Sequence, residues 1–359
     1  MAHSSVTVNR KELFLRACRC QPVPRVPVWI MRQAGRYLPE YRAVRAKHTF
    51  LEVCKMPELA AQVSLQPFEI LGVDAVIVFS DILIVAEAMG MPLEVPDGGP
   101  VLGNPVRDEA AVRALKQFDP EKETRFLGDA IRMICRENGA DVPVLGFAGA
   151  PWTLACYMIE GRARTEFNHA KRMLYAEPQL LRQLLEAIAR ATARYLRSQI
   201  AAGARAVQIF DTWAGELGTR EYEEFELPAL QMLIREIDAG ETPVILYSKA
   251  SNHLLALLAK TGANVLSFDW RTDLSAARKV LGPRIALQGN VDPAILLSSE
   301  DLAGAAAAEA IEKTGGSGHI LNLGHGILPE TPVENARAFV RAGQAVNLQS
   351  QAATSRHSP

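Results

Sequence analysis

The chain has 359 residues, a net charge of −1 at neutral pH and a pI near 6.7. This balance provides no overall electric field that would attract nucleic acid or an anionic membrane, so an anionic ligand must be bound by a local cluster of cations. No apolar run approaches the roughly 18 residues of a membrane-spanning helix, and the amino-terminal segment lacks a signal-peptide pattern. We therefore expect a cytoplasmic protein that binds neither nucleic acid nor membranes.

The cysteines indicate neither a disulfide framework nor a zinc site. They are odd in number and scattered, and they show no Cys-x-x-Cys or His-x-Cys spacing. Cys18 and Cys20 are the only close pair in the sequence, and we interpret them as thiols of an amino-terminal helix. The sequence therefore predicts no bound metal.

The first predicted elements lead into an arginine-rich stretch. Residues 9–20 have the apolar spacing of a helix, with Asn9 as its N-cap. Residues 28–31 follow a proline and are β-branched, aromatic and apolar, which predicts a buried strand. Arg32 then opens a stretch with four arginines up to position 45, whose early glycine and proline prevent a regular helix until about residue 40.

Arg32 and Arg36 should therefore lie on an irregular loop at the carboxyl end of a strand. A guanidinium group offers a carboxylate two parallel donors and stays charged at working pH, so converging arginines favour a ligand with several anionic groups. The alternative is a solvated basic loop that makes only weak surface ion pairs. The position directly after a buried strand favours a binding site.

Further along the chain, apolar strands alternate with helical patterns. A helix over about 57–71 separates the first strand from a second one at 75–79, which predicts a parallel crossover. Alternation of eight strands with helices indicates an α/β protein built as a single-domain (β/α)8 TIM-type barrel, regular or distorted. The alternative, an open doubly wound sheet, predicts a G-x-G-x-x-G turn that the sequence lacks. The other predicted strands are 142–147, 206–210, 243–247, 264–268, 284–288 and 320–323, and the other helices are 123–138, 178–202, 221–239, 252–260, 273–281, 300–314 and 333–346.

Two segments stand apart from this alternation. Residues 91–106 are rich in proline and glycine and predict a hairpin-like insertion after strand 2, where it would wall the mouth of the barrel. Residues 349–359 are small and polar, so we expect a disordered tail after a barrel domain that spans 1–348.

In such a barrel the active site lies at the carboxyl ends of the strands, so polar residues that follow strands should converge on one cavity. Asp81 follows an apolar strand, where a carboxylate needs hydrogen-bond donors or a cation to stay charged. It either caps the next helix or pairs with an arginine, or it presents its charge to a cationic or N–H-bearing group. Position alone selects Arg32, Arg36, Asp81, Asp211, Thr212, Lys249, Asp269, Asn290 and His325.

Three further side chains permit two interpretations each. His325 stands between glycines, which let the imidazole face the cavity, although a lone histidine is often structural. Tyr157 follows a strand end and a helix start, so its phenol faces either the cavity or the barrel wall. The hydroxyl of Thr212 either contacts a ligand or caps a helix.

Six segments, in order, resemble the motifs of the uroporphyrinogen decarboxylase family. The longest is Pro-Val-Trp-Ile-Met-Arg-Gln-Ala-Gly-Arg-Tyr-Leu-Pro-Glu-Tyr at 27–41. The likeness extends over about residues 10–346. The other segments are Val-Phe-Ser-Asp-Ile-Leu (78–83), Gly-Ala-Pro-Trp-Thr-Leu (149–154), Phe-Asp-Thr-Trp-Ala-Gly (210–215), Leu-Gln-Gly-Asn-Val-Asp-Pro (287–293) and Asn-Leu-Gly-His-Gly (322–326).

The resemblance implies a carboxy-lyase of porphyrin and haem biosynthesis. Such an enzyme converts the four acetate side chains of uroporphyrinogen III stepwise to methyl groups and releases coproporphyrinogen III. The resemblance also implies a small-molecule substrate, no cofactor and a homodimer. Asp81 would hydrogen-bond the pyrrole N–H groups and stabilise the transition state, with Arg32 and Arg36 completing the catalytic set. The residues implied to bind substrate are Arg32, Gln33, Ala34, Gly35, Arg36, Asp81, Tyr157, Thr212 and His325.

Physical chemistry explains why this reaction needs no cofactor. Loss of carbon dioxide leaves an electron pair, which many enzymes place on pyridoxal phosphate, thiamine or a metal. A pyrrole protonated on the ring carbon beside its nitrogen becomes a cation conjugated to the acetate and accepts that pair itself. A carboxylate such as Asp81 would stabilise the developing positive charge.

Two other functions compete with this one. A zinc-dependent corrinoid methyltransferase of the same barrel superfamily would need a His-x-Cys pair and a distant cysteine near strand ends, and the predicted strand ends carry no cysteine. A non-catalytic porphyrin-binding protein would keep the barrel without the chemistry. Asp81, both loop arginines and His325 are present, which favours an enzyme.

Overall fold

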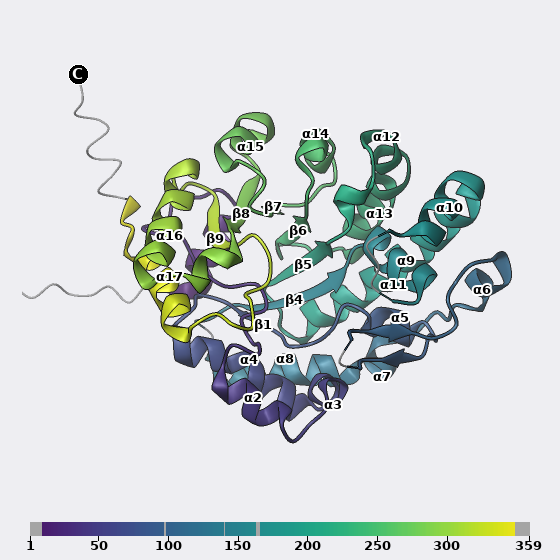
Figure 1. Ribbon diagram of the computed structural model, residues 1–359, viewed down its shortest axis with the longest axis horizontal. Helices are drawn as coiled ribbons and strands as arrows, with labels where there is room; N and C mark the ends of the chain where they lie inside the picture. The colour runs from purple at the N-terminus through teal and green to yellow at the C-terminus, as the bar shows by residue number, and fades with distance from the viewer. Residues whose placement is uncertain (1–8, 97, 140, 163–165, 349–359) are drawn as a thin grey trace, which may run out of the picture.

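The structure is a computed structural model that describes residues 9–96, 98–139, 141–162 and 166–348. At its centre a seven-stranded parallel sheet, in the order β1-β4-β5-β6-β7-β8-β9, curls round with helices on its outer side (Figure 1). The tail predicted at 349–359 lies outside the described residues. The strands are β1 (Val76–Ile77), β4 (Val144–Gly149), β5 (Ala206–Asp211), β6 (Val244–Ser248), β7 (Val265–Phe268), β8 (Ala286–Val291) and β9 (His319–Leu323).

The segment after Pro27 lies between the two edges of the curled sheet. Val28 forms a parallel bridge with Leu321 of β9. On its other side, the N–H of Asp74, just before β1, donates to the carbonyl of Val28 at 2.7 Å. The strand predicted at 28–31 is therefore a single bridge residue, and the predicted α/β barrel is present in a distorted form.

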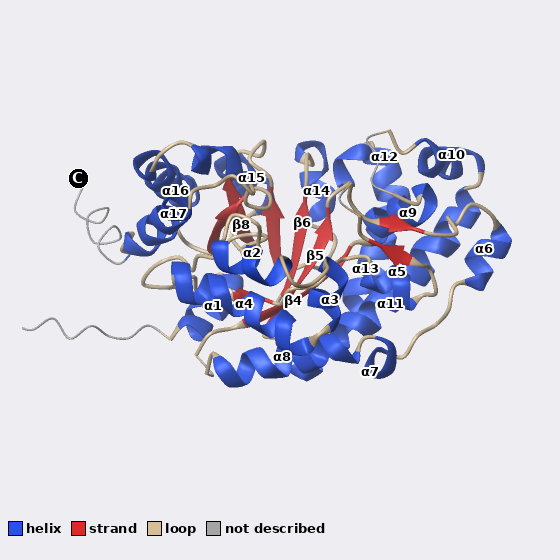
Figure 2. Ribbon diagram, turned by 60° about the horizontal axis from the view of Figure 1, so that its bottom comes forward, coloured by secondary structure: helices blue, strands red, loops and turns tan. Residues whose placement is uncertain are grey.

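Helices cover the outside of the sheet (Figure 2). The predicted helices at 57–71, 178–202 and 300–314 are confirmed at their predicted bounds. The helix predicted at 221–239 is instead divided into α12, the π-helical segment η2 and α13. The helices are α1 (Arg10–Cys18), α2 (Pro39–Arg45), α3 (Phe50–Lys55), α4 (Pro57–Leu71), α5 (Ile84–Ala88), α6 (Glu109–Ala114), α7 (Pro120–Glu123), α8 (Arg125–Glu137), α9 (Pro151–Glu160), α10 (Asn168–Ala176), α11 (Pro178–Ala202), η1 (Ala214–Glu216), α12 (Thr219–Glu221), η2 (Tyr222–Glu226), α13 (Leu227–Ile237), η3 (Asn252–Leu254), α14 (Leu255–Leu258), α15 (Leu274–Leu281), η4 (Pro293–Leu297), α16 (Glu300–Thr314) and α17 (Val333–Ala345).

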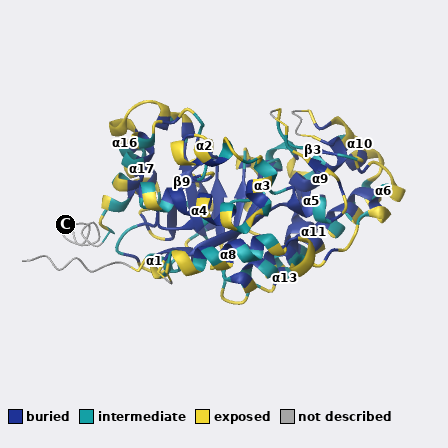
Figure 3. Cartoon of the chain, turned by 90° about the horizontal axis from the view of Figure 1, so that it is seen from below, coloured by how far each residue is buried: buried dark blue, intermediate teal, exposed yellow. Residues whose placement is uncertain are grey.

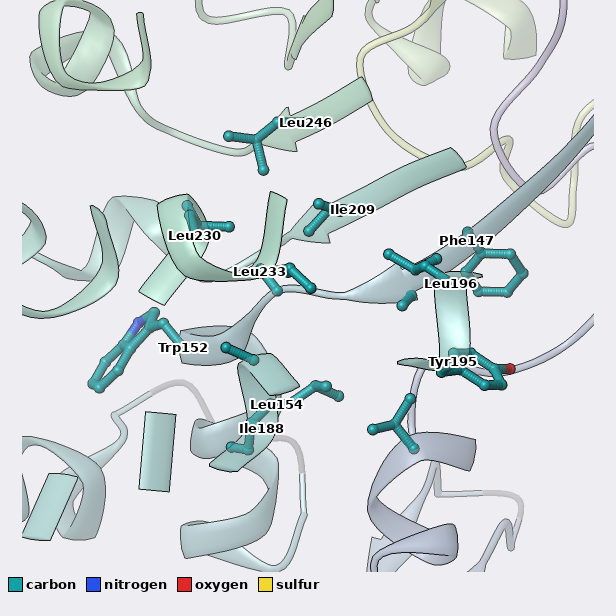
Figure 4. Close-up of a cluster of buried hydrophobic side chains, with 14 of the residues drawn as sticks. Phe147, Trp152, Leu154, Ile188, Tyr195, Leu196, Ile209, Leu230, Leu233 and Leu246 are labelled. Atoms are coloured by element: carbon teal, nitrogen blue, oxygen red, sulfur yellow. The ribbon is translucent and has the colours of Figure 1, made fainter. Parts of the chain in front are cut away.

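The main core lies between the sheet and the helices that cover it. Exposed residues gather on the outer helices, whereas the strands are buried (Figure 3). Figure 4 shows part of this core, where Trp152 of α9, Ile188 of α11 and Leu233 of α13 lie near Phe147 of β4 and Ile209 of β5. Burial of this apolar area is the principal favourable term in folding.

The inside of the barrel is filled from its amino-terminal end. Leu13 and Phe14 of α1 pack against apolar residues near the starts of the strands, among them Ile245. In the interior, Gln288 accepts a hydrogen bond from the Trp29 indole at 3.0 Å. It also donates to Gln208 at 3.0 Å and to Ser267 at 2.9 Å. A ligand site is therefore expected at the other end, where the strands terminate.

The predicted insertion at 91–106 is confirmed as a hairpin, in which β2 (Leu93–Glu94) pairs antiparallel with β3 (Val101–Leu102). The N–H of Leu102 donates to the carbonyl of Gly161 at 2.7 Å, so the hairpin braces the end of α9. Among the described helices, none is both long and apolar enough to cross a lipid bilayer.

Candidate active site

Residues 28–31 form the segment that closes the barrel. This segment does not continue as a strand because side-chain oxygens accept its backbone N–H groups. The N–H of Met31 donates to the side-chain oxygen of Asn322 at 2.8 Å, and that of Ile30 to Gln33 Oε1 at 3.2 Å. Arg32 follows with a φ of 61°, in the left-handed region that residues other than glycine seldom adopt. Such local strain is commonly retained where a site requires it. The chain thus turns at the mouth of the barrel and presents Arg32 there.

Hydrogen bonds of the Gln33 side chain hold this turn in place. It is fully buried, and its amide donates to the carbonyl of Ala75 at 3.1 Å while accepting from Ile30. The Tyr37 hydroxyl donates to the Gln33 carbonyl at 2.8 Å. Both ends of its amide are engaged, and its backbone N–H donates to the Ile30 carbonyl at 2.9 Å. Gln33 therefore holds the turn, and its predicted contact with substrate finds no free donor on this residue.

The loop from Ala34 to Arg36 has backbone N–H groups that are available to a ligand. Within the described part of the chain, the N–H groups of Ala34, Gly35 and Arg36 have no hydrogen-bond acceptor. A β-carbon at Gly35 would lie 2.9 Å from the Arg32 carbonyl oxygen, so the turn requires glycine. Arg32 and Arg36 are both exposed, and neither forms an ion pair with a described carboxylate. The loop therefore suits an anion that comes from outside the chain.

His325 lies next to the Arg32 side chain, since a β-carbon at Gly326 would overlap the arginine methylenes. Its ring stands edge-on to Tyr247, with the ring centroids 6.2 Å apart. Burial first, and then the charges of Arg32, Lys249 and Arg271, lower the pKa of His325 to about 3. The imidazole is therefore neutral at physiological pH and has an N–H to donate.

Asp81 lies in the loop after β1, at the same end of the barrel as His325, which follows β9. Its Oδ1 accepts the N–H of Leu83 at 2.8 Å, which shapes the turn into α5. Its Oδ2 has no hydrogen bond to any described residue. Burial raises the pKa of Asp81, whereas the Leu83 N–H and the Arg32 charge act in the opposite direction. One oxygen of Asp81 thus holds the turn, as the structural alternative predicts, and the other remains available to a ligand.

Tyr157 faces the same region. α9 is buried along its length except at Tyr157, which keeps part of its surface exposed. Burial raises the pKa of Tyr157 to about 12, and the Asp81 charge adds to this effect while Arg32 opposes it. The phenol therefore stays protonated. The structure brings together Arg32, Asp81, Tyr157 and His325, which are separate in sequence.

Arg36 and Thr212 lie further from this cluster. Arg36 is exposed on the rim, and its charge acts on the Tyr41 hydroxyl, not on Asp81 or His325. Thr212 follows β5 and is half-buried, and its hydroxyl makes no hydrogen bond with the described residues. The helix-capping alternative for Thr212 has no supporting contact, so its hydroxyl remains a candidate for binding.

Three other polar residues at strand ends have structural partners. Asp211 is buried and accepts a hydrogen bond from the Thr153 hydroxyl at 2.9 Å. Asp269 pairs with Arg271 at 2.6 Å. Asn290 donates to the carbonyls of Asp269 at 2.8 Å and Thr272 at 2.6 Å. These residues hold the loops that surround the mouth.

Glu226 is a second buried carboxyl group near Asp211, and it lies inside a predicted helix, where no motif singled it out. Glu226 accepts the N–H of Trp152 at 2.9 Å, and Trp213 donates its N–H to Thr153 at 3.2 Å, so the two acids connect the start of α9 to the loop after β5. Burial raises the pKa of Asp211 to about 7, and burial together with the Asp211 charge raises that of Glu226 well above its ordinary value. One oxygen of each group has no partner among the described residues. The pair is therefore protonated below neutral pH.

This pair predicts a loss of stability as the pH rises from the acid range through neutrality. Between about pH 4 and pH 7 the folded chain holds a proton that the unfolded chain releases, so the free energy of unfolding falls as pH rises through the folded-state pKa. In Glu226→Gln the amide oxygen still accepts from Trp152, and the substitution removes both the second titrating group and the like charge near Asp211. Between pH 6 and pH 8.5 the wild-type Tm should fall by about 3 °C more than that of the variant. The exposed control is Glu223→Gln. If Tm falls with pH equally in Glu226→Gln and in this control, the raised pKa values of the Asp211–Glu226 pair are contradicted.

The fold and the site define an α/β-barrel enzyme whose strand ends carry arginines without an ion pair among the described residues and a carboxylate, Asp81, with one uncommitted oxygen. The family model described as uroporphyrinogen decarboxylase (URO-D) matches residues 9–346, and the chain belongs to this family. It is 49% identical over 329 residues to the uroporphyrinogen decarboxylase of Trichlorobacter lovleyi, with 91% of this chain and 96% of that protein covered. It is 48% identical over 338 residues to that of Thioalkalivibrio sulfidiphilus, with 92% and 96% covered.

A solved methyltransferase from Methanosarcina mazei has a similar fold, with a TM-score of 0.78 at 25% identity over 93% of this chain and 98% of that one. Among the described residues, no group of three or more His, Cys, Asp or Glu side chains is arranged to hold a metal ion. The sequence likeness therefore favours the decarboxylase family over the methyltransferase alternative.

Proposed function

We propose that this protein is a carboxy-lyase that converts the four acetate side chains of uroporphyrinogen III to methyl groups and releases coproporphyrinogen III. The observation that carries the proposal is the Asp81 carboxylate, which has one uncommitted oxygen in a desolvated position near the unpaired Arg32. Membership of the family supports the same reaction. The catalytic set in this proposal is Asp81, Arg32 and Arg36.

Asp81 acts on the macrocycle through charge. Its uncommitted oxygen accepts hydrogen bonds from pyrrole N–H groups, and its negative charge stabilises the ring cation that forms when a ring carbon is protonated. The carbon–carbon bond to the carboxylate then breaks, carbon dioxide leaves, and the electron pair enters the ring. Protonation of the exocyclic carbon gives the methyl group, and loss of the proton from the ring carbon restores the neutral pyrrole, so that one proton is consumed for each carbon dioxide released. Because the ring accepts the electron pair, the proposed reaction includes no cofactor.

The arginine loop holds the substrate by its carboxylates. Arg32 and Arg36 provide guanidinium forks, and Ala34, Gly35 and Arg36 add backbone donors. Tyr157, protonated at working pH, and His325, which is neutral, add hydrogen-bond donors near Asp81. In this proposal Gln33 contributes by holding the loop in place, and Thr212 contributes through its hydroxyl.

Arg36→Lys tests the role of the loop. A lysine keeps the charge but replaces the planar fork with a point charge, so we expect KM to rise about tenfold with little change in kcat. Arg125→Lys, a conservative change in an exposed side chain of α8, is the matched control. Steady-state kinetics that give the variant and the control the same KM would remove Arg36 from the binding site.

Turnover of the substrate under anaerobic conditions tests the proposed function itself. Purified protein is incubated with uroporphyrinogen III, and the products are oxidised and separated by chromatography. Partially decarboxylated intermediates followed by the tetracarboxylate are expected. Absence of these products would contradict the proposal, and methyl transfer dependent on stoichiometric zinc would establish the methyltransferase alternative.

We also propose that the protein is a homodimer in the cytoplasm and that residues 1–348 form its one catalytic domain. The family likeness supports this assembly, and the absence of a membrane-spanning helix among the described elements is consistent with the location. Sedimentation-velocity centrifugation should give twice the mass of the 39.2 kDa chain. A single species at the monomer mass would contradict the proposed dimer.

A further inference from the structure

Two cations after β6 and β7 have no part in the function proposed above. Lys249 directly follows β6 and is half-buried, with its ammonium nitrogen 5.3 Å from the centroid of the Trp213 ring. No carboxylate in the described part of the chain forms an ion pair with it. Arg271, after β7, stacks on Trp270 at 4.4 Å and is partly exposed.

The same carboxylate holds the two loops close together. Asp269 Oδ2 accepts the N–H of Ala250 at 3.1 Å, next to Lys249, and a guanidinium N–H of Arg271 at 2.6 Å. Asp269 is fully buried, so these contacts fix the loop positions. Burial first, and then the charges of Arg271 and Arg32, lower the pKa of Lys249, while the charges of Asp269 and Glu216 oppose this effect. The three cations therefore face a common space.

This space adjoins the active site. Gly324 packs so closely on the backbone of Trp270 that a β-carbon there would overlap it, which places the His325 turn against the Arg271 loop. On the other side, the Trp213 ring that supports Lys249 also contacts Tyr157, with the ring centroids 6.4 Å apart. Lys249 and Arg271 therefore border the cluster that contains His325 and Tyr157.

The order of the strands places these cations across the mouth from the arginine loop. The closing segment that carries Arg32 lies between β1 and β9, and β6 is halfway round the curled sheet from it. A cyclic polyacid carries carboxylates on all sides of its ring, so a loop on one side of the mouth can bind only some of them. The far side of the mouth then needs its own cations.

We propose that Lys249 and Arg271 form a second carboxylate-binding subsite, which takes a carboxylate side chain of the macrocycle on the side opposite to the arginine loop. This inference rests on the proposed function. Arg271 is oriented by Asp269 and Trp270, whereas Lys249 lies against Trp213 and forms no ion pair with a described carboxylate, so its ammonium group is available to a ligand. The subsite thereby favours a macrocycle with more carboxylates over one with fewer.

Lys249→Met tests the subsite, because methionine retains the packing on Trp213 and removes only the charge. The matched control is Lys260→Met, an exposed lysine that pairs with Glu223 and lies before β7, at the other end of the barrel. Binding of uroporphyrin I, an octacarboxylate, and coproporphyrin I, a tetracarboxylate, is measured by isothermal titration calorimetry at two salt concentrations. Anaerobic kinetics with uroporphyrinogen III are measured in parallel.

In Lys249→Met the Kd for uroporphyrin should rise about tenfold, with a smaller change for coproporphyrin and a weaker dependence on salt. Lys249→Arg should restore most of the affinity, since it restores the charge. Equal affinities in Lys249→Met and Lys260→Met, or equal losses in Lys249→Met and Lys249→Arg, would overturn the subsite. Failure of the proposed function is distinct from both, because it would show as a lack of turnover in the wild-type protein.

Discussion

Asp81→Asn should lower kcat by about a hundred- to a thousand-fold, the loss expected when a preorganised group that stabilises transition-state charge is neutralised in a desolvated site. The amide retains an oxygen that accepts the Leu83 N–H, so the turn into α5 keeps its shape. In the proposed function the substrate is bound mainly through its carboxylates, whereas Asp81 contacts only the pyrrole N–H groups. KM should therefore change little, and the loss should fall on the chemical step.

The pH dependence provides an independent test of the same assignment. Asp81 must be ionised to stabilise a cation, and burial raises its pKa above that of an ordinary aspartate. As pH falls through this raised pKa, wild-type kcat/KM should fall, and this acid limb should be absent from the residual activity of Asp81→Asn. Anaerobic initial rates over a pH series measure both effects, with Asp129→Asn, in an exposed ion pair, as control. Equal losses in kcat and in substrate affinity would contradict a role in charge stabilisation.

The fold was predictable where its determinants are local. α4 begins with proline at its first turn and ends at Gly72, whose φ of 72° allows the left-handed cap. α16 has the Ser299 N-cap and the corresponding Gly315. In these helices a few adjacent residues determine where the helix begins and ends, and the apolar spacing identifies the buried face. The parallel order of the strands then follows from the helical crossovers between them.

The prediction was wrong where distant residues determine the backbone. The expected strand at 28–31 is reduced to one bridge because Gln33 and Asn322 accept its N–H groups, and Asn322 is 291 positions from the Met31 that it binds. The helix expected at 221–239 is interrupted by a π-helical segment at Glu226, which reaches the N-terminus of α9. The spacing of apolar residues within a segment does not indicate such hydrogen-bond partners.

The candidate site divides in the same way. Arg32, Asp81 and His325 could be selected because residues that follow parallel strands share one end of the barrel. The buried amide of Gln33, the carboxyl pair of Asp211 and Glu226, and the position of Lys249 on Trp213 depend on three-dimensional packing. The sequence therefore located the mouth but did not separate the side chains that hold it from those that face a ligand.

Asp74 is the clearest example of a residue that the sequence did not single out, and Asp74→Asn should cost about 3 to 5 kcal/mol of stability. The Asp74 side chain is fully buried just before β1 and accepts two hydrogen bonds from Arg25, at 2.7 and 2.8 Å. It also accepts hydrogen bonds from the N–H of Val28 at 2.9 Å and from the side-chain amide of Gln344 at 3.2 Å. A second ion pair joins it to Arg10 at 3.3 Å. It thereby fixes the segment that closes the barrel to β1 and to the end of α17.

Asparagine would put an N–H group where a carboxylate oxygen now faces a guanidinium, which leaves the charge of the half-buried Arg25 without its partner. The cost of an unpaired buried charge exceeds that of a lost surface pair, for which Asp129→Asn, opposite the exposed Arg132, is the matched control at less than about 1 kcal/mol. Urea unfolding followed by circular dichroism measures both differences. In the double variant Asp74→Asn/Arg25→Met the charge is removed together with its partner, so part of the lost stability should return. Similar losses in Asp74→Asn and Asp129→Asn would show that Asp74 does not hold the barrel closed.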